Sequence, residues 1–269
     1  MDLLGHESVG SGPERVIVLH DWMGDHRNYD PMVPYLDGRT FSYEFVDLRG
    51  YGLSRNLTGR YDLAEASADV LALATGLGWP RFHLVGHSMS SLVAQQVAVT
   101  APDRVTSLVV LTPVGPAGMS APEAVIEYLE QVAMDEGARR VGLANQWGDR
   151  LSDQWLEFKL RRWSESARPE ASRGYVRMFG ATAVLGTPRS DLPVLAVIGD
   201  RDNEPFLELP VREALSVAYP SLELTVCPNV GHYPMQEAPV ALATTIERFL
   251  RRPLALGHRS SPPPALRNP

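Results

Sequence analysis

The fold is decided by the stretch FHLVGHSMSSLVA, residues 82–94. An apolar run typical of a strand, residues 82–87, leads into the turn Gly-His-Ser-Met-Ser, residues 86–90, and a helical pattern of small residues follows. A sharp strand-to-helix turn of this kind holds a serine side chain out from the backbone, as a nucleophile requires. Ser88 is therefore the candidate nucleophile, and it needs a base, an acid that orients the base, and donors for an oxyanion.

Composition indicates one folded domain whose partners are neither nucleic acid nor membrane. The chain has 269 residues, 44% of them hydrophobic, which is enough for one large core. Its formal net charge of −7 argues against nucleic acid, whose binding needs clustered positive charge. No apolar run approaches the roughly 20 residues of a membrane span, and the start lacks the features of a secretory signal. The single cysteine, Cys227, fits a reducing compartment, so we expect a cytoplasmic protein.

Strand and helix patterns alternate along most of the chain. Strands are expected at 14–20, 43–48, 82–87, 105–111, 192–200 and 222–227. Helices are expected between residues 25 and 36 and at 62–77, 89–100, 209–218 and 239–251. This alternation predicts an α/β fold with a mostly parallel, doubly wound sheet, in which sites form at the carboxyl ends of the strands.

One long segment departs from the alternation. Residues 115–190 show helical patterns only, and we interpret them as a helical cap inserted into the α/β core. The core then consists of residues 1–114 and 191–252, and the proline-rich end, residues 253–269, is expected to be disordered. Tyr128, Trp147 and Trp155 of the cap are candidates for lining a substrate pocket, although their helical spacing fits packing within the cap as well.

The motifs of the chain resemble those of the α/β-hydrolase fold superfamily from about residue 14 to residue 252. They are HDW at 20–22, RGYGLS at 49–54, GHSMS at 86–90, GDRD at 199–202 and GHYP at 231–234. The resemblance implies a triad in the chain order Ser, Asp, His. Ser88 would be the nucleophile, Asp202 the orienting acid and His232 the base, with Asp200 and Glu204 as competing acids.

The resemblance also implies an oxyanion hole formed by the backbone N–H groups of Trp22 and Met89. Two residues beside these positions depart from the family pattern, because Asp21 and Ser90 stand where the family usually has glycine. Aspartate tolerates unusual backbone angles better than most residues, and serine adds only one small side chain, so both changes are expected to be accommodated. His87 adjoins the candidate nucleophile and is expected to point away from it.

These observations together predict a serine hydrolase that cleaves a small or medium, apolar carboxylic ester or lactone through an acyl-enzyme. The partner would be a small-molecule acyl substrate, and the protein a monomer or a homodimer. No cofactor is implied, and the histidines show no metal-ligand spacing. Other activities known on such a scaffold stay open: a C–C bond hydrolase, a thioesterase, a cofactor-free peroxidase or oxygenase, or a small-molecule binding protein with little turnover.

Overall fold

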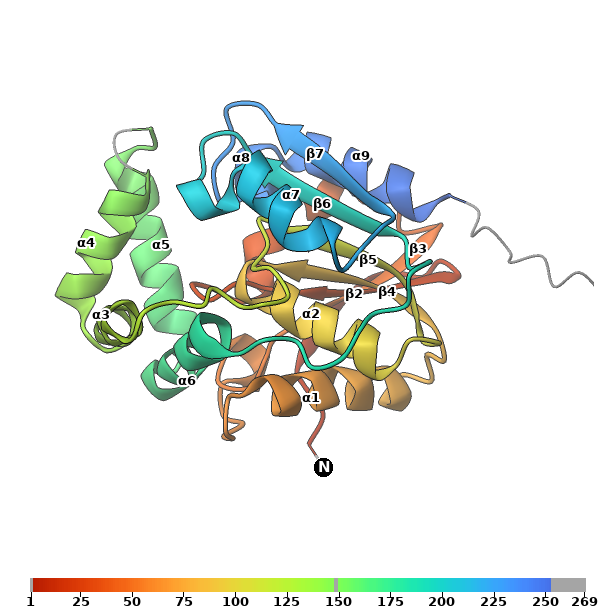
Figure 1. Ribbon diagram of the computed structural model, residues 1–269, viewed down its shortest axis with the longest axis horizontal. Coiled ribbons are helices and arrows are strands. Elements are labelled where there is room, and N and C mark those ends of the chain that lie inside the picture. The colour runs from red at the N-terminus through yellow and green to blue at the C-terminus, as the bar shows by residue number, and fades with distance from the viewer. Residues whose placement is uncertain (1, 148–149, 253–269) are drawn as a thin grey trace, which may run out of the picture.

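The computed structural model describes residues 2–147 and 150–252, which are built around a seven-stranded sheet (Figure 1). The strands are β1 (His6–Gly10), β2 (Glu14–Leu19), β3 (Phe41–Val46), β4 (Phe82–His87), β5 (Val105–Leu111), β6 (Val194–Gly199) and β7 (Leu222–Cys227). Their spatial order is β1-β3-β2-β4-β5-β6-β7. Only β1 runs antiparallel to its neighbour, so the predicted mostly parallel sheet is confirmed.

Helices cover both faces of this sheet. They are α1 (Leu63–Gly76), α2 (Met89–Thr100), α7 (Glu208–Ser216), the short α8 (Pro234–Glu237) and α9 (Pro239–Leu250). In Figure 1, α1 and α2 lie below the sheet and α9 lies above it. Every residue of β3, β4, β5 and β6 is buried, as expected of strands that are covered on both faces.

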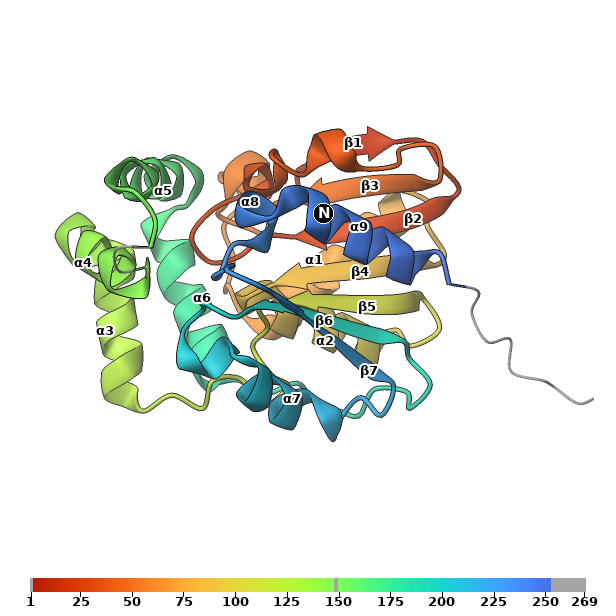
Figure 2. The same ribbon diagram turned by 90° about the horizontal axis from the view of Figure 1, so that it is seen from above.

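Four further helices stand between β5 and β6 in the chain. They are α3 (Glu123–Met134), α4 (Glu136–Trp147), α5 (Asp153–Ser166) and α6 (Pro169–Ala181), and we call them the helical insert. Figure 2 shows the insert beside the end of the sheet at which the parallel strands finish. It therefore lies over the loops that carry the sequence motifs. Within residues 2–147 and 150–252, no helix is long and apolar enough to cross a lipid bilayer.

Two segments differ from the sequence-based expectation. Residues 25–36 form two short 3₁₀ turns, η1 (His26–Tyr29) and η2 (Val33–Tyr35), and not an α-helix. Pro31 and Pro34 lack the N–H groups that an α-helix would need there, and each ring crowds the preceding turn. Strand β1 was not expected, because its sequence, HESVG, contains no apolar run. The expected disordered tail, residues 253–269, lies outside the described residues.

Candidate active site

The turn between β4 and α2 places Ser88 at the carboxyl end of the central strand. Ser88 has φ 51° and ψ −118°, a strained conformation that L-residues rarely adopt. A Cβ atom on Gly86 would lie 2.6 Å from the carbonyl oxygen of Ser90 and 2.9 Å from the Cβ of Ala94. Glycine at residue 86 therefore lets α2 pack directly against β4. The strand-turn-helix geometry expected from residues 82–94 is present.

Three of the sequence-predicted residues meet at this turn. The Nε2 atom of His232 lies 2.9 Å from the Oγ of Ser88, and its Nδ1 atom lies 2.7 Å from an Oδ of Asp202. When Nδ1 donates its hydrogen to the Asp202 carboxylate, the lone pair of Nε2 faces the Ser88 hydroxyl. The imidazole is thus placed to accept the hydroxyl proton.

The environment of His232 adjusts its basicity. Burial acts to lower the pKa of His232, but the charge and the hydrogen bond of Asp202 outweigh burial, so the pKa lies above its ordinary value of 6.5. The Phe206 ring packs edge-on against the imidazole, with 4.7 Å between the ring centroids. A raised pKa makes the imidazole a stronger proton acceptor and stabilises the cation that forms when it accepts.

The two competing acids lie elsewhere. An Oδ of Asp200 accepts the backbone N–H of Asn229 at 2.7 Å, and the same carboxylate lies 3.7 Å from the guanidinium of Arg201. Glu204 is exposed at the start of the 3₁₀ turn η4 (Glu204–Phe206). Only Asp202, among these three carboxylates, hydrogen-bonds to His232 in the described structure.

The loop after β2 is held by several hydrogen bonds. The Trp22 carbonyl accepts the Tyr51 hydroxyl at 3.0 Å, and the Trp22 indole N–H donates to the Ser172 carbonyl at 2.8 Å. The Asp21 carboxylate accepts the backbone N–H of Met23 at 3.0 Å. Asp21 is not among the described residues with positive φ, so its backbone has no need of glycine. These hydrogen bonds hold the main chain of Trp22 in place. Met89, the other residue expected to contribute to the oxyanion hole, is the first residue of α2.

Residues next to the triad have structural partners. His20 donates from Nδ1 to the Asp21 carbonyl at 2.6 Å and accepts the Leu48 N–H at 3.1 Å. The His87 ring lies 5.3 Å from the His232 ring, centroid to centroid, and its Nε2 donates to the His232 carbonyl at 2.8 Å. Ser90 is fully buried, and its hydroxyl has no hydrogen-bond partner within the described structure. The serine that replaces the family glycine therefore fits, at the cost of one unpaired polar group.

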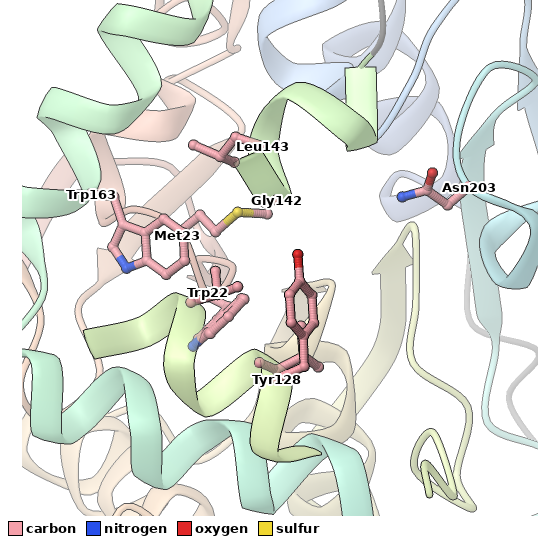
Figure 3. A pocket seen from close by; sticks show the side chains of 9 residues that line it. Trp22, Met23, Tyr128, Gly142, Leu143, Trp163 and Asn203 are labelled. Atoms are coloured by element: carbon pink, nitrogen blue, oxygen red, sulfur yellow. The ribbon is translucent and has the colours of Figure 1, made fainter. Parts of the chain in front are cut away.

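A cavity of about 330 Å³ opens between the helical insert and the loop after β2 (Figure 3). Its walls are mostly apolar and aromatic, and they consist of Trp22, Met23, Tyr128, Leu129, Val132, Gly142, Leu143, Trp163 and Asn203. Asn203 follows Asp202 directly and Trp22 belongs to the candidate oxyanion loop, so the cavity shares one loop with the triad and one with the candidate oxyanion hole. Figure 3 shows the Tyr128 hydroxyl between Met23 and Asn203.

The three pocket candidates have different outcomes. Tyr128 lines the cavity. Trp155 does not line this cavity. Its indole ring packs edge-on against Tyr233, and it lines a separate hollow with Phe158. Trp147 ends α4, and its side chain lies outside the described residues.

Sequence reasoning missed most of the cavity wall. The pocket residues expected from the sequence did not include Leu129 and Val132 of α3 or Leu143 of α4, although Leu129 and Val132 belong to an apolar stripe with helical spacing. A stripe shows which face of a helix is buried, and it does not show whether that face meets protein or an open cavity.

Comparison with known proteins identifies the class to which this fold and site belong. The model of the alpha/beta hydrolase family matches residues 16–245. The chain therefore belongs to the alpha/beta hydrolase family, and the expected class of enzyme, a hydrolase, is confirmed at that level.

Three similar proteins illustrate the range of activities named among the relatives of this chain. A pimeloyl-[acyl-carrier protein] methyl ester esterase of Aeromonas hydrophila is 29% identical, over 91% of this chain and 98% of that protein. The acetyltransferase component of the acetoin cleaving system of Pseudomonas putida is 30% identical over 91% of this chain, which spans only 66% of that protein. The crystal structure of a bromoperoxidase from Bacillus anthracis superposes with a TM-score of 0.77 at 19% identity, covering 92% of this chain and 95% of that one.

Proposed function

We propose that this protein is a serine hydrolase that cleaves a small or medium, apolar carboxylic ester or lactone through an acyl-enzyme. The observation that carries the proposal is the continuous hydrogen-bonded series Ser88, His232 and Asp202, together with an apolar cavity whose wall includes Asn203, the residue after Asp202. The esterase from Aeromonas hydrophila, which matches along nearly its whole length, supports ester chemistry as the first choice.

The contacts of the triad support the proton transfers of such a reaction. His232 takes the Ser88 proton on Nε2 while the serine oxygen attacks the carbonyl carbon. The backbone N–H groups of Met89 and Trp22 stabilise the resulting oxyanion. The carbonyl re-forms as the alcohol leaves with the proton from His232, which yields the acyl-enzyme. Water then attacks this ester, gives its proton to His232, and the free acid departs as Ser88 regains a proton.

The cavity supports the size and character of the acyl group. Its volume of about 330 Å³ lies at the low end of the range for small-molecule sites, which is about 300–1,000 Å³. Leu129, Val132 and Leu143 offer an apolar surface to an aliphatic or aryl chain. The Tyr128 hydroxyl and the Asn203 amide are the polar groups on the wall, so a substrate with one polar atom beyond the ester would be accommodated.

The proposal is tested with p-nitrophenyl acetate, butyrate, hexanoate and octanoate, together with a γ- and a δ-lactone. We expect hydrolysis of at least one substrate, with Ser88→Ala losing activity by roughly 10⁴-fold or more. Ser90→Ala is the matched control, because it removes a hydroxyl two residues away that bonds to nothing described in the structure. The proposal is wrong if no ester or lactone is hydrolysed, or if Ser88→Ala is as active as Ser90→Ala.

Two further measurements separate an enzyme from a binding protein. A fluorophosphonate probe should form an adduct at Ser88, and absence of this adduct would favour the binding protein. The pH profile of kcat/KM reports the base, because only neutral His232 can accept a proton. Since the pKa of His232 is raised, kcat/KM should decline with falling pH through a midpoint above 6.5.

A further inference from the structure

The sequence contains a single lysine, Lys159, and its side chain is fully buried. It belongs to α5 of the helical insert, and it reaches down into the loops at the end of the sheet. Its Nζ atom lies 3.2 Å from the side-chain oxygen of Asn28 in η1, and 3.7 Å from the centre of the Tyr233 ring. An ammonium group removed from water destabilises the fold unless a negative charge compensates it.

The compensating charge is the carboxylate of Asp21, which is also fully buried and is linked to Lys159 through the side chain of Asn28. It accepts hydrogen bonds from the Tyr233 hydroxyl, from the Asn28 amide at 2.5 Å and from the Met23 N–H. Burial acts to raise the pKa of Asp21, but Lys159, His87 and these hydrogen bonds bring it well below its usual range. Burial lowers the pKa of Lys159 to about 8, and Asp21 limits the decrease. Both groups are therefore charged at neutral pH.

The other charged groups in this region face different partners. Arg162 of α5 bonds to Asp25 at 2.6 Å and to Glu165 at 3.1 Å. Arg162 lowers the pKa of Lys159 and Asp25 raises it, so their effects oppose each other. Since Arg162 is engaged with these two carboxylates, Lys159 is the cation that balances Asp21.

This buried cluster is connected to the backbone of His232 from two sides. Tyr233, the next residue, donates its hydroxyl to Asp21 and lies under the Lys159 ammonium. His87 donates to the His232 carbonyl, and its other ring nitrogen lies 4.0 Å from the Asp21 carboxylate. The charges of Lys159 and Asp21 also act on the pKa of His232: Asp21 raises it and Lys159 lowers it.

We propose that Lys159 is a positioning residue, which balances the Asp21 carboxylate under the helical insert and thereby holds Tyr233 and the His232 loop in register with Ser88. The proposal rests on the proposed role of His232 as the base. The helical insert would then do more than cover the cavity, because the alignment of the triad would depend on the packing of α5 against the loops of the core. Asp21, which stands where the family usually has glycine, supplies the negative charge on the side of the α/β core.

The first test compares Lys159→Met with Arg161→Met, which removes a mostly exposed charge two residues further along α5. Methionine keeps an unbranched apolar stem of similar length but removes the ammonium group, and with it the charge and the hydrogen bond to Asn28. We expect kcat to fall by up to about 100-fold in Lys159→Met, as small displacements of reacting groups produce, with little change in KM. Because Asp21 is then unbalanced, the midpoint of the kcat/KM profile should move to higher pH. Arg161→Met should match the wild type in both.

The double variant Lys159→Met/Asp21→Asn removes both charges and decides the cause. We expect the pH midpoint to return toward the wild-type position, and folding stability to recover relative to Lys159→Met. If Lys159→Met does not fold and the double variant does, the charge balance is supported. A Lys159→Met enzyme with wild-type kcat and pH midpoint, or a double variant no more stable than Lys159→Met, overturns the proposal.

The last measurement is independent of any catalytic activity. Lysine labelled with ¹³C at the ε carbon gives one side-chain signal, because the chain has one lysine. It should titrate near pH 8 in the wild type and at lower pH in Asp21→Asn, where the balancing carboxylate is lost. A midpoint near the ordinary value of about 10.4, or no change in Asp21→Asn, contradicts the charge balance. If these shifts occur but no ester is hydrolysed, the proposed function fails and the charge balance between Lys159 and Asp21 stands.

Discussion

The loops at the carboxyl edge of the sheet and the helical insert use polar side chains in opposite ways. At the edge, the side chains of His232 and Asp202 are 3% and 1% exposed and bond to each other from different loops. On the insert, polar pairs such as Arg140 with Glu157 are about half exposed. Buried, mutually oriented groups interact strongly, whereas exposed ion pairs are screened by water and salt. The edge can therefore hold reacting groups in place, and the outer face of the insert can vary.

The two regions meet through a small number of buried polar contacts. Lys159 reaches Asn28 and Tyr233, Arg162 reaches Asp25, and Arg150 pairs with Glu237. Glu237 in turn accepts the backbone N–H groups on both sides of His232. Changes at the edge should thus affect chemistry, changes on the outer face of the insert should affect little, and changes at the contacts should affect alignment.

The largest effect should come from the acid that orients His232. Asp202→Asn should reduce kcat by about 10⁴-fold, because the amide favours the wrong imidazole tautomer and cannot stabilise its cation. Asp200→Asn is the matched control, since this carboxylate lies two residues away and accepts a backbone N–H of Asn229 instead. Steady-state kinetics on the best ester of the panel provides the measurement. A greater loss in Asp200→Asn than in Asp202→Asn would reverse the assignment.

An intermediate effect is expected on stability at the buried part of the edge. Burial lowers the pKa of His87 to about 4, so the unfolded chain takes up a proton before the folded protein does as pH falls. Stability should decrease between pH 6.5 and pH 4, by on the order of 3 kcal/mol from this group. His87→Gln can still donate to the His232 carbonyl. Its free energy of unfolding, measured with urea, should decrease less steeply between pH 6.5 and pH 4 than that of the wild type. Equal slopes for the wild type and His87→Gln would show that His87 does not carry this dependence.

The smallest effect should be found on the outer face of the insert. Arg140→Gln removes an ion pair with Glu157 whose two side chains are 46% and 49% exposed. Because water and salt screen such a pair, its loss should leave the unfolding midpoint and kcat/KM at wild-type values. Thermal unfolding and ester hydrolysis check both values. A clear loss of activity would show that the outer face of α4 contributes to the site.

Local patterns were sufficient for much of the fold and for the candidate triad. Residues 82–87, 89–100, 105–111 and 222–227 have the expected element at the expected bounds, because apolar runs and breakers act within a few residues. Ser88, Asp202 and His232 could be selected because each follows a strand, and parallel strands end at one edge of a sheet. Strand β1 could not be foreseen, since its pairing with β3 and not its own composition makes it a strand.

By itself, the sequence determined the alternation of strands and helices, the turn at Ser88 and the order of the triad. These features depend on short-range preferences and on the fixed direction of parallel strands. Only the tertiary structure decided that Lys159 meets Asn28 and Tyr233, that Trp163 and Leu143 line the cavity, and that Trp155 does not. These contacts join segments that are far apart in the sequence, and an amphipathic helix specifies which face it buries without specifying what that face meets.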